Sequence, residues 1–365
     1  MRGHEFAQYR YSVTRVYHFK KTKVIEQEVV EMQEETIEMD DPPRIAGLVF
    51  RHLKGPSDYP GIVSAIESSQ KADRLETTTT VESLARKLEH PFNMDPSKDM
   101  LIADVDGEII GSALVWWMDD PMDKRFYMFS SNLVPEWRGK RIRRCMLRYC
   151  ERRLREIAKE QNTDRKRYFR AFARDTEEHW RKVLEDEGYG VVLYSFKMIR
   201  TDLANVPDLP LPGGVEIRSG REEDVKLFFA AWNEATKDMN DAPRLADEMI
   251  EQMKMDPSWN PSLWQLAWHD GKVIGTVMVV IDSAENEKFN RKRGVTELIS
   301  VARPWRNKGI AKAIIAKALR TLKEKGMNEA TLGVDANNAG GALALYERMG
   351  YKSTQCLISY WKEMV

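Results

Sequence analysis

The chain has 365 residues, of which 42% are hydrophobic and 31% charged, a composition that excludes fibrous and intrinsically disordered proteins. Its 57 Lys and Arg residues equal its 57 Asp and Glu residues, so no net charge draws the protein to nucleic acid or to an anionic membrane. At about 100 to 200 residues per domain, this length predicts two domains.

Cysteine and histidine usage excludes two further kinds of site. Cys145, Cys150 and Cys356 are too few and too irregularly spaced for a disulfide framework, and the six histidines form no cluster with metal-ligand spacing. No segment approaches the roughly 20 continuous apolar residues of a membrane span, and residues 1–10 lack the apolar core of a signal peptide. We therefore expect a cytoplasmic protein that binds neither a metal nor a membrane.

Two segments make up the first part of the chain. Residues 1–45 mix β-branched and aromatic residues with a glutamate-rich run, and they predict an N-terminal extension with an added strand or hairpin. Residues 46–202 form the first predicted domain. Three of its segments return later in the same order and at a nearly constant offset, which indicates a duplication. The matched pairs are Asp106–Gly111 with Asp270–Gly275, Val134–Ile142 with Ala302–Ile310, and Glu187–Tyr189 with Met349–Tyr351.

The first predicted domain also carries a local excess of positive charge. Residues 138–174 contain fifteen Arg and Lys residues against four Asp and Glu residues. Part of this stripe falls on a predicted helix with Arg144, Arg148, Arg152 and Arg155 on one face. Such a stripe could bind RNA, an anionic acceptor or an acidic partner. We favour a solvated surface paired with acidic residues elsewhere, because the net charge of the chain is zero.

A linker and a second domain follow. Prolines and glycines concentrate in Asn205–Gly214, which predicts an extended linker over residues 203–214. In residues 215–365 the hydrophobic periodicities alternate in the order β-α-β-β-β-α-β-α-β. The expected strands are 215–218, 263–269, 273–281, 294–301, 330–334 and 356–361, and the expected helices are 221–236, 310–325 and 340–348.

The junction between the strand at 294–301 and the helix that begins near Ile310 predicts an anion site. A loop that opens a helix presents unpaired backbone N–H groups at the positive end of the helix dipole, and phosphate is their natural ligand. Gly309 and Ala311 leave room for phosphate oxygens, while Arg306 and Lys308 add positive charge. Alone, this loop would be an ordinary strand-to-helix turn.

A second motif lies beyond this loop. Residues 306–311, Arg-Asn-Lys-Gly-Ile-Ala, fit the signature Arg/Gln-x-x-Gly-x-Gly/Ala, and residues 338–351 fit Asn-x-x-x-Ala-x-x-Leu-Tyr-x-x-x-Gly-Tyr. In this order, and on a strand-helix-strand-helix frame, the two motifs resemble those of the GNAT superfamily of N-acetyltransferases over residues 215–361. The resemblance implies an α/β (α+β) fold of two tandem GNAT-like domains, each a mixed twisted sheet flanked by helices. The tandem architecture is similar to that of mycothiol synthase.

The resemblance also assigns roles to residues of the second domain. Ile299 and Val301 would offer main-chain groups to the pantetheine arm of acetyl-CoA. Arg306, Asn307, Lys308, Gly309, Ile310 and Ala311 would hold its pyrophosphate, and Asn338 would touch the cofactor. Tyr346 would stabilise or protonate the departing sulfur. The alternative is a tyrosine whose ring only packs against the core at helical spacing. Glu297 is the candidate base for the attacking amine, and the alternatives are a solvated strand glutamate or an ion-pair partner.

The first domain departs from both motifs. Arg141 and Arg143 stand where Gly309 and Ala311 stand, Leu184 replaces Tyr346, and Thr176 replaces Asn338. We therefore expect a degenerate GNAT-like domain over 46–202 and a catalytic one over 215–365.

These observations predict an acyl-CoA-dependent N-acetyltransferase. It would use acetyl-CoA as co-substrate and act on a small-molecule or peptide amine by direct attack. Two alternatives stay open, namely a non-catalytic acyl-CoA sensor or scaffold, and an RNA-associated protein that uses the basic 138–174 stripe. The intact loop and Tyr346 favour catalysis, and the arginines lack interleaved base-stacking aromatics, so we do not expect nucleic acid as a partner.

Overall fold

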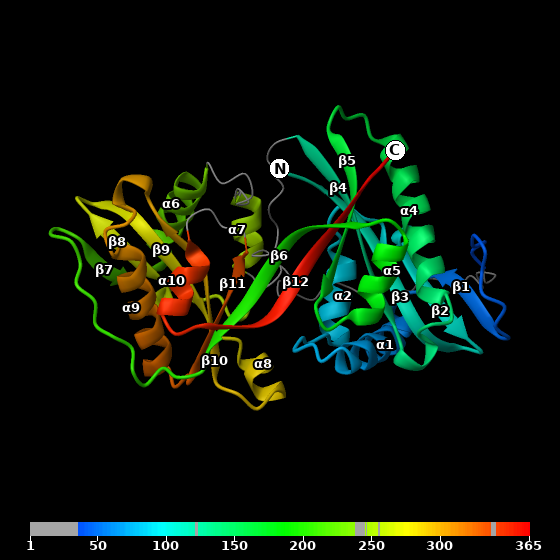
Figure 1. Ribbon diagram of the computed structural model, residues 1–365, viewed down its shortest axis with the longest axis horizontal. Helices are drawn as coiled ribbons and strands as arrows, with labels where there is room; N and C mark the ends of the chain where they lie inside the picture. Colours follow the sequence, from blue (N-terminus) through cyan, green and yellow to red (C-terminus); the bar gives the residue numbers. More distant parts are fainter. Residues whose placement is uncertain (1–35, 121–122, 238–244, 246, 255, 337–340) are drawn as a thin grey trace, which may run out of the picture. The chain divides into compact units, whose positions relative to one another are not determined.

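A computed structural model describes residues 36–120, 123–237, 245, 247–254, 256–336 and 341–365. The chain divides into two compact units (Figure 1). The N-terminal unit takes in the described residues of Tyr17–Val192 and also Ile358–Val365, and the C-terminal unit takes in the described residues of Leu193–Leu357. Residues 1–35 of the predicted extension lie outside the described residues, and from its remainder Ile37 N donates to Phe50 O at 2.7 Å.

The N-terminal unit is a mixed sheet flanked by helices. Its strand order is β1-β2-β3-β4-β5-β12, and its pairs from β1 to β4 are antiparallel whereas β4 and β5 are parallel. Helices α1 and α4 both pack against β3 and β4. The elements are β1 (Leu48–His52), α1 (Tyr59–Ala72), α2 (Val81–Glu89), α3 (Pro96–Asp99), β2 (Met100–Val105), β3 (Glu108–Asp119), β4 (Lys124–Leu133), α4 (Ile142–Glu160), β5 (Lys166–Arg174), α5 (Glu178–Asp186) and β6 (Gly190–Arg200).

The C-terminal unit repeats this plan. Its strand order is β12-β6-β11-β10-β9-β8-β7, with β10 and β11 parallel and the pairs from β10 to β7 antiparallel. The elements are β7 (Glu216–Ser219), α6 (Val225–Thr236), α7 (Asp247–Met253), β8 (Gln265–His269), β9 (Lys272–Val280), α8 (Ser283–Lys288), β10 (Arg293–Val301), α9 (Ile310–Glu324), β11 (Glu329–Asp335), α10 (Ala342–Arg348) and β12 (Lys352–Glu363). The predicted strands and long helices are confirmed, and α7 and α8 are additions to the predicted order.

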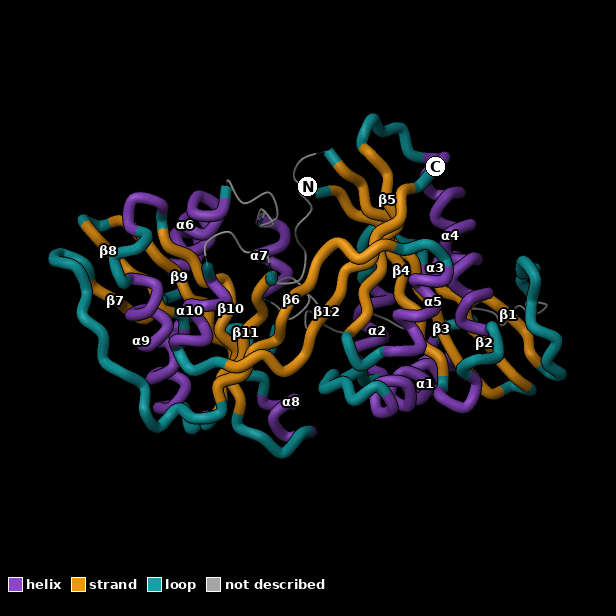
Figure 2. The backbone as a smooth tube through the Cα atoms, in the orientation of Figure 1, coloured by secondary structure: helices purple, strands orange, loops and turns teal. Residues whose placement is uncertain are grey.

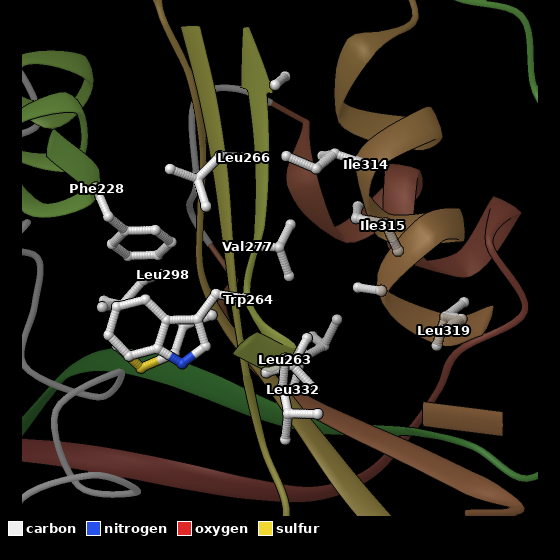
Figure 3. Packing of buried hydrophobic residues seen from close by; sticks show 14 of the residues in the cluster. Phe228, Leu263, Trp264, Leu266, Val277, Leu298, Ile314, Ile315, Leu319 and Leu332 are labelled. Atoms are coloured by element: carbon white, nitrogen blue, oxygen red, sulfur yellow. The ribbon is translucent and has the colours of Figure 1, made fainter. Parts of the chain in front are cut away.

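The core of the C-terminal unit explains why these segments fold as they do. Figure 3 shows Phe228 of α6 on one side of the strands and Ile314 and Leu319 of α9 on the other. All three side chains are fully buried, as the helical spacing of their apolar neighbours requires. The Trp264 ring lies 4.8 Å from the Phe228 ring, so this tryptophan, which directly precedes β8, is a core residue.

Two strands run from one unit into the other (Figure 2). Residues Ser195–Arg200 of β6 pair antiparallel with Asp335–Ala330 of β11 inside the C-terminal unit. The end of β12 serves the N-terminal unit, where the Trp361 ring lies 4.6 Å from that of Phe126. The division between the units therefore falls within β6, ahead of the predicted linker at 203–214. That segment forms no helix or strand and lies along α9, where Arg320 donates to Pro207 O at 2.8 Å.

Candidate active site

The sheet of the C-terminal unit opens between its two parallel strands. Strands β10 and β11 pair only from Arg293 to Val295 and from Glu329 to Thr331, although both continue well beyond these residues. A pocket occupies the region where pairing stops. It is lined by Val295, Thr296, Glu297 and Ile299 of β10, by Thr331, Leu332 and Gly333 of β11, and by Tyr346 of α10. Three predicted site residues, Glu297, Ile299 and Tyr346, are thus brought together.

A β-bulge interrupts β10 beside this pocket. Glu297 pairs with Met278 and Ser300 pairs with Thr276, so Leu298 and Ile299 together oppose the single residue Val277. Leu298 has φ 48°, a left-handed backbone conformation that bulky side chains rarely adopt. The bulge changes the direction of the strand at the point where Glu297 and Ile299 line the pocket.

The backbone of Val301 faces the same opening. Ala302 N donates to Ile274 O on β9 at 2.8 Å, and successive residues of an antiparallel strand direct their backbone groups to opposite sides. The N–H and C=O of Val301 therefore point away from β9, toward the side of β11. The carbonyl accepts a hydrogen bond from Arg306 Nε at 3.1 Å.

The predicted anion loop has the backbone that such a site needs. Asn307 has φ 63° and Gly309 has φ 84°, and α9 begins directly after them. The first bond of the helix runs from Ala313 N to Gly309 O at 3.1 Å, so the amides of Ile310, Ala311 and Lys312 have no partner one turn earlier. A Cβ placed on Gly309 would meet no atom within 4 Å. The space beside Gly309 is therefore open, and the neighbouring Lys308 is exposed, with its Nζ 4.8 Å from the centroid of the Trp305 ring.

Arg306, which the sequence predicts to hold pyrophosphate, also donates to two backbone carbonyls. Its guanidinium donates to Val301 O at 3.1 Å and to Ala235 O at 2.7 Å. These two bonds fasten the loop to the ends of β10 and α6. Asn338, the remaining predicted cofactor contact, lies outside the described residues.

Tyr346 packs against Tyr351, a buried residue that the sequence did not predict to be part of the site. The Tyr346 side chain is only 4% exposed, and its ring lies 6.1 Å from that of Tyr351. The Tyr351 hydroxyl is 3.1 Å from Thr296 Oγ1 on β10, which ties the end of α10 to the strand that bears Glu297. Burial raises the pKa of Tyr346 far above its ordinary value and that of Tyr351 to about 12. Both phenols therefore stay protonated and able to donate at neutral pH.

The N-terminal unit keeps the loop backbone but fills the site with its own side chains. Gly139 has φ 78° and Arg141 has φ 66°, which matches Asn307 and Gly309. However, the Gly139 amide donates to His179 Nε2 at 3.2 Å. Arg143 is 2% exposed, lies over the Trp180 ring at 4.2 Å and donates to a backbone carbonyl of β4.

Two other features distinguish the N-terminal unit from the C-terminal one. Leu184, which stands where Tyr346 stands, is fully buried and cannot donate a proton. Strand β4 pairs with β3 in continuous register from Leu133 to Arg125, so the counterpart of β10 has no bulge. In the described part of this unit, the position of Tyr346 therefore has no phenol and the counterpart of β10 has no bulge.

The basic stripe on α4 is occupied by ion pairs. Arg148 meets Glu187 at 2.9 Å, Arg152 meets Asp40 at 3.1 Å, and Arg155 meets Glu151 at 3.1 Å. These contacts support the interpretation of the stripe as a paired surface.

No helix within the described ranges is long and apolar enough to cross a membrane. No group of three or more His, Cys, Asp or Glu side chains there could hold a metal ion.

Part of the C-terminal unit matches a known family model. Residues 228–351 match the model described as Acetyltransferase (GNAT) family. An Arabidopsis thaliana protein named N-alpha-acetyltransferase MAK3 is 35% identical over 101 residues, which cover 28% of this chain and 50% of the relative. A Streptomyces coelicolor protein named mycothiol acetyltransferase is 26% identical over 160 residues, 44% of this chain and 50% of the relative. The chain spans about half the length of each of these relatives.

Solved structures match both halves of the chain. A GCN5-related N-acetyltransferase from Sphaerobacter thermophilus gives a TM-score of 0.70 at 22% identity, covering 89% of this chain and 97% of that one. A tandem GNAT protein from the clavulanic acid biosynthesis pathway gives 0.62 at 12% identity, covering 87% and 98%. At these identities the likeness is one of fold, and it confirms the predicted tandem GNAT architecture.

Proposed function

We propose, from the match of residues 228–351 to the GNAT acetyltransferase family, that the C-terminal unit transfers an acetyl group from acetyl-CoA to an amine. The acceptor is a small molecule or a peptide, and its amine attacks the thioester directly. The observation that carries this proposal is the pocket where β10 and β11 part, which joins Glu297, Ile299 and Tyr346. The N-terminal unit would support this site without catalysing the reaction.

The residues of the C-terminal unit fit the shape of acetyl-CoA. The free amides of Ile310, Ala311 and Lys312 suit a pyrophosphate, because they lie at the positive end of α9 and the preceding residue, Gly309, has no side chain and open space around it. The backbone of Ile299 and Val301 borders the opening into which a pantetheine arm would extend. When bound there, acetyl-CoA supplies an activated acyl group and a thiolate leaving group.

Tyr346 would stabilise the thiolate by donating a hydrogen bond. A free thiol has a pKa of about 8.5, whereas burial holds the pKa of the Tyr346 phenol far above 10. The proton is therefore more stable on the phenol than on the sulfur. This order favours a hydrogen bond to the developing charge, with the proton retained by Tyr346, over complete proton transfer.

Glu297 would take the proton of the acceptor. An alkyl ammonium has a pKa of about 10.4 and cannot attack until it loses a proton. Glu297 is the one acidic residue of the pocket lining, and the bulge that follows it directs the strand there. A carboxylate at this position would also attract a cationic amine.

The decisive experiment is turnover of acetyl-CoA against amines, amino acids, aminoglycosides and peptides, followed by release of free thiol. We expect thiol release with at least one acceptor class. The Gly309→Arg variant serves as the control for background hydrolysis. Tight binding of acetyl-CoA without turnover on any acceptor would instead favour a sensor or scaffold, and absence of binding would overturn the proposal.

A further inference from the structure

The bulge in β10 contains an unusual backbone conformation at the edge of the pocket. Leu298 lies in the left-handed region with φ 48°, where a bulky residue is strained and glycine is the usual occupant. Such strain persists only where the surroundings hold it in place, and it gathers at functional sites. The residues that hold Leu298 are therefore candidates for a functional role.

Two contacts hold it. The Leu298 side chain is 8% exposed, and Figure 3 shows it beside Phe228 and Trp264 in the core. Thr276 on the neighbouring strand β9 is fully buried, and its hydroxyl donates to Leu298 O at 2.9 Å. The same hydroxyl is 2.7 Å from Ser300 Oγ. Thr276 thus bonds to residues on both sides of Ile299, one of which is the strained residue itself.

We infer that Thr276 is a positioning residue, whose hydroxyl fixes the β10 bulge and so sets the backbone of Ile299 for the pantetheine arm. This inference rests on the proposed function for its ligand. Thr276 does not line the pocket, so it would act only through the strand that it holds. The acceptor of this hydrogen bond is the backbone carbonyl of Leu298, so no change of side chain on β10 can remove it. Its donor is the hydroxyl of Thr276 on the neighbouring strand β9.

The chain contains an internal comparison for this device. Ser112 on β3 occupies the position of Thr276, since the preceding residues Gly111 and Gly275 correspond in the repeat. Ser112 is also buried, but it pairs with Asn132 in a ladder without a register shift. No residue of β4 has a positive φ. A buried hydroxyl at this position does not by itself make a bulge, because β10 has a register shift opposite Thr276 and β4 has none opposite Ser112.

The test uses three variants of the full chain. Thr276→Val keeps the shape and the strand preference of the side chain but removes the hydroxyl. Thr276→Ser restores the hydroxyl, and Ser112→Ala is the matched change in the N-terminal unit. The measurements are calorimetric titration with acetyl-CoA, the KM for acetyl-CoA against kcat, thermal unfolding, and amide hydrogen exchange of Leu298–Ser300.

We expect Thr276→Val to weaken acetyl-CoA binding about tenfold, since a buried acceptor left without its donor loses stabilisation of this order. Exchange of the Leu298–Ser300 amides should accelerate in the same variant. Thr276→Ser and Ser112→Ala should both stay within about twofold of the unmodified protein. Loss of affinity in Ser112→Ala as well would mean a general loss of stability, and would overturn the inference.

The exchange measurement separates this inference from the proposed function. If the unmodified protein does not bind acetyl-CoA, the function fails, and the role of Thr276 is still decided by the exchange of the bulge. If the unmodified protein binds acetyl-CoA and Thr276→Val binds it equally with unchanged exchange, the function stands and Thr276 has no positioning role. Should Thr276→Val unfold, Ser300→Ala provides the second test, because it removes only the contact between the two hydroxyls. Acetyl-CoA affinity should then fall by less than tenfold, and exchange of the Leu298–Ser300 amides should accelerate to a smaller extent.

Discussion

A buried phenol can stabilise a developing negative charge only while it remains protonated. Tyr346 meets this condition at neutral pH because burial raises its pKa. We expect Tyr346→Phe, which keeps the ring, to lower kcat by about 10²- to 10³-fold, the usual cost of one donor to a developing charge. The affinity for acetyl-CoA should change little. Steady-state kinetics with calorimetry measure both quantities, and kcat within a factor of two of the unmodified enzyme would remove this role from Tyr346.

We expect His179 to make the free energy of unfolding depend on pH. Burial, together with the nearby charges of Arg143 and Arg138, lowers the pKa of His179 from 6.5 to about 4. Between these pH values the unfolded chain binds a proton at this position that the folded protein does not. The free energy of unfolding contributed by His179 is therefore highest above pH 6.5, and it falls as the pH decreases toward 4.

Replacing His179 tests this dependence. His179→Gln retains an acceptor for the Gly139 amide but does not titrate. We expect the loss of melting temperature between pH 7.5 and pH 5 to be smaller in the variant than in the unmodified protein. Equal losses in the two proteins would show that this imidazole is not the titrating group.

Single residues also mark how far sequence reasoning reached. The motifs predicted that Glu297, Ile299 and Tyr346 belong to one site, and all three line one pocket. The bonds of Arg306 to Val301 and Ala235 could not be predicted, because a charge shows nothing of the carbonyls that the fold brings to it. Leu298 was also missed, since glycine, asparagine and aspartate are the residues that commonly adopt the left-handed conformation, and leucine rarely does.

At the scale of elements, the loop before α9 decides whether phosphate can approach. Arg141 adopts the conformation of Gly309 in the N-terminal unit, so Gly309→Arg copies a loop that the fold already tolerates. We expect this variant to lose acetyl-CoA binding by at least about a hundredfold, because the side chain covers several main-chain donors. Calorimetry measures the loss.

Gly326 provides the matched control for that change. It has φ 82° against 84° for Gly309, and a Cβ on either would meet no atom within 4 Å. Gly326→Arg should therefore cost the same conformational stability while leaving acetyl-CoA affinity intact. Equal loss of affinity in the two variants would trace the effect to backbone strain and not to the anion site.

Elements with strong hydrophobic periodicity were predictable, and those without it were not. Helix α9 buries a continuous apolar face and was expected almost to the residue. Helix α8 has six residues and no buried side chain, and it begins because Asp282 accepts a hydrogen bond from Glu285 N at 2.9 Å. A short polar helix of this kind leaves no periodic signal in the sequence.

At the scale of the whole molecule, the two units should differ in ligand binding. In the N-terminal unit the Gly139 amide is bonded to His179, and Arg143 and Leu184 fill the interior. We expect one acetyl-CoA per chain in a calorimetric titration. Two equivalents of comparable affinity would show that the first loop still binds phosphate.

Strands β6 and β12 each contribute residues to both units, so they predict which fragments of the chain can fold alone. A fragment of residues 215–357 lacks β6 and leaves the edge of β11 unpaired from Ala330 to Asp335, which favours aggregation. A fragment of residues 190–357 retains that strand and should remain soluble with a cooperative thermal transition. Similar solubility and melting of both fragments would show that β6 is dispensable.

The placement of Ile358–Val365 in the N-terminal unit also affects the order of folding during synthesis. A ribosome usually completes an N-terminal domain before the next one emerges. Here Leu193–Leu357 must all be translated before the strand that borders β5 exists. Until then, the β5 edge of the nascent N-terminal unit has no neighbouring strand, whereas every strand of the C-terminal unit has already been translated. The half that is translated second is the first that can be complete.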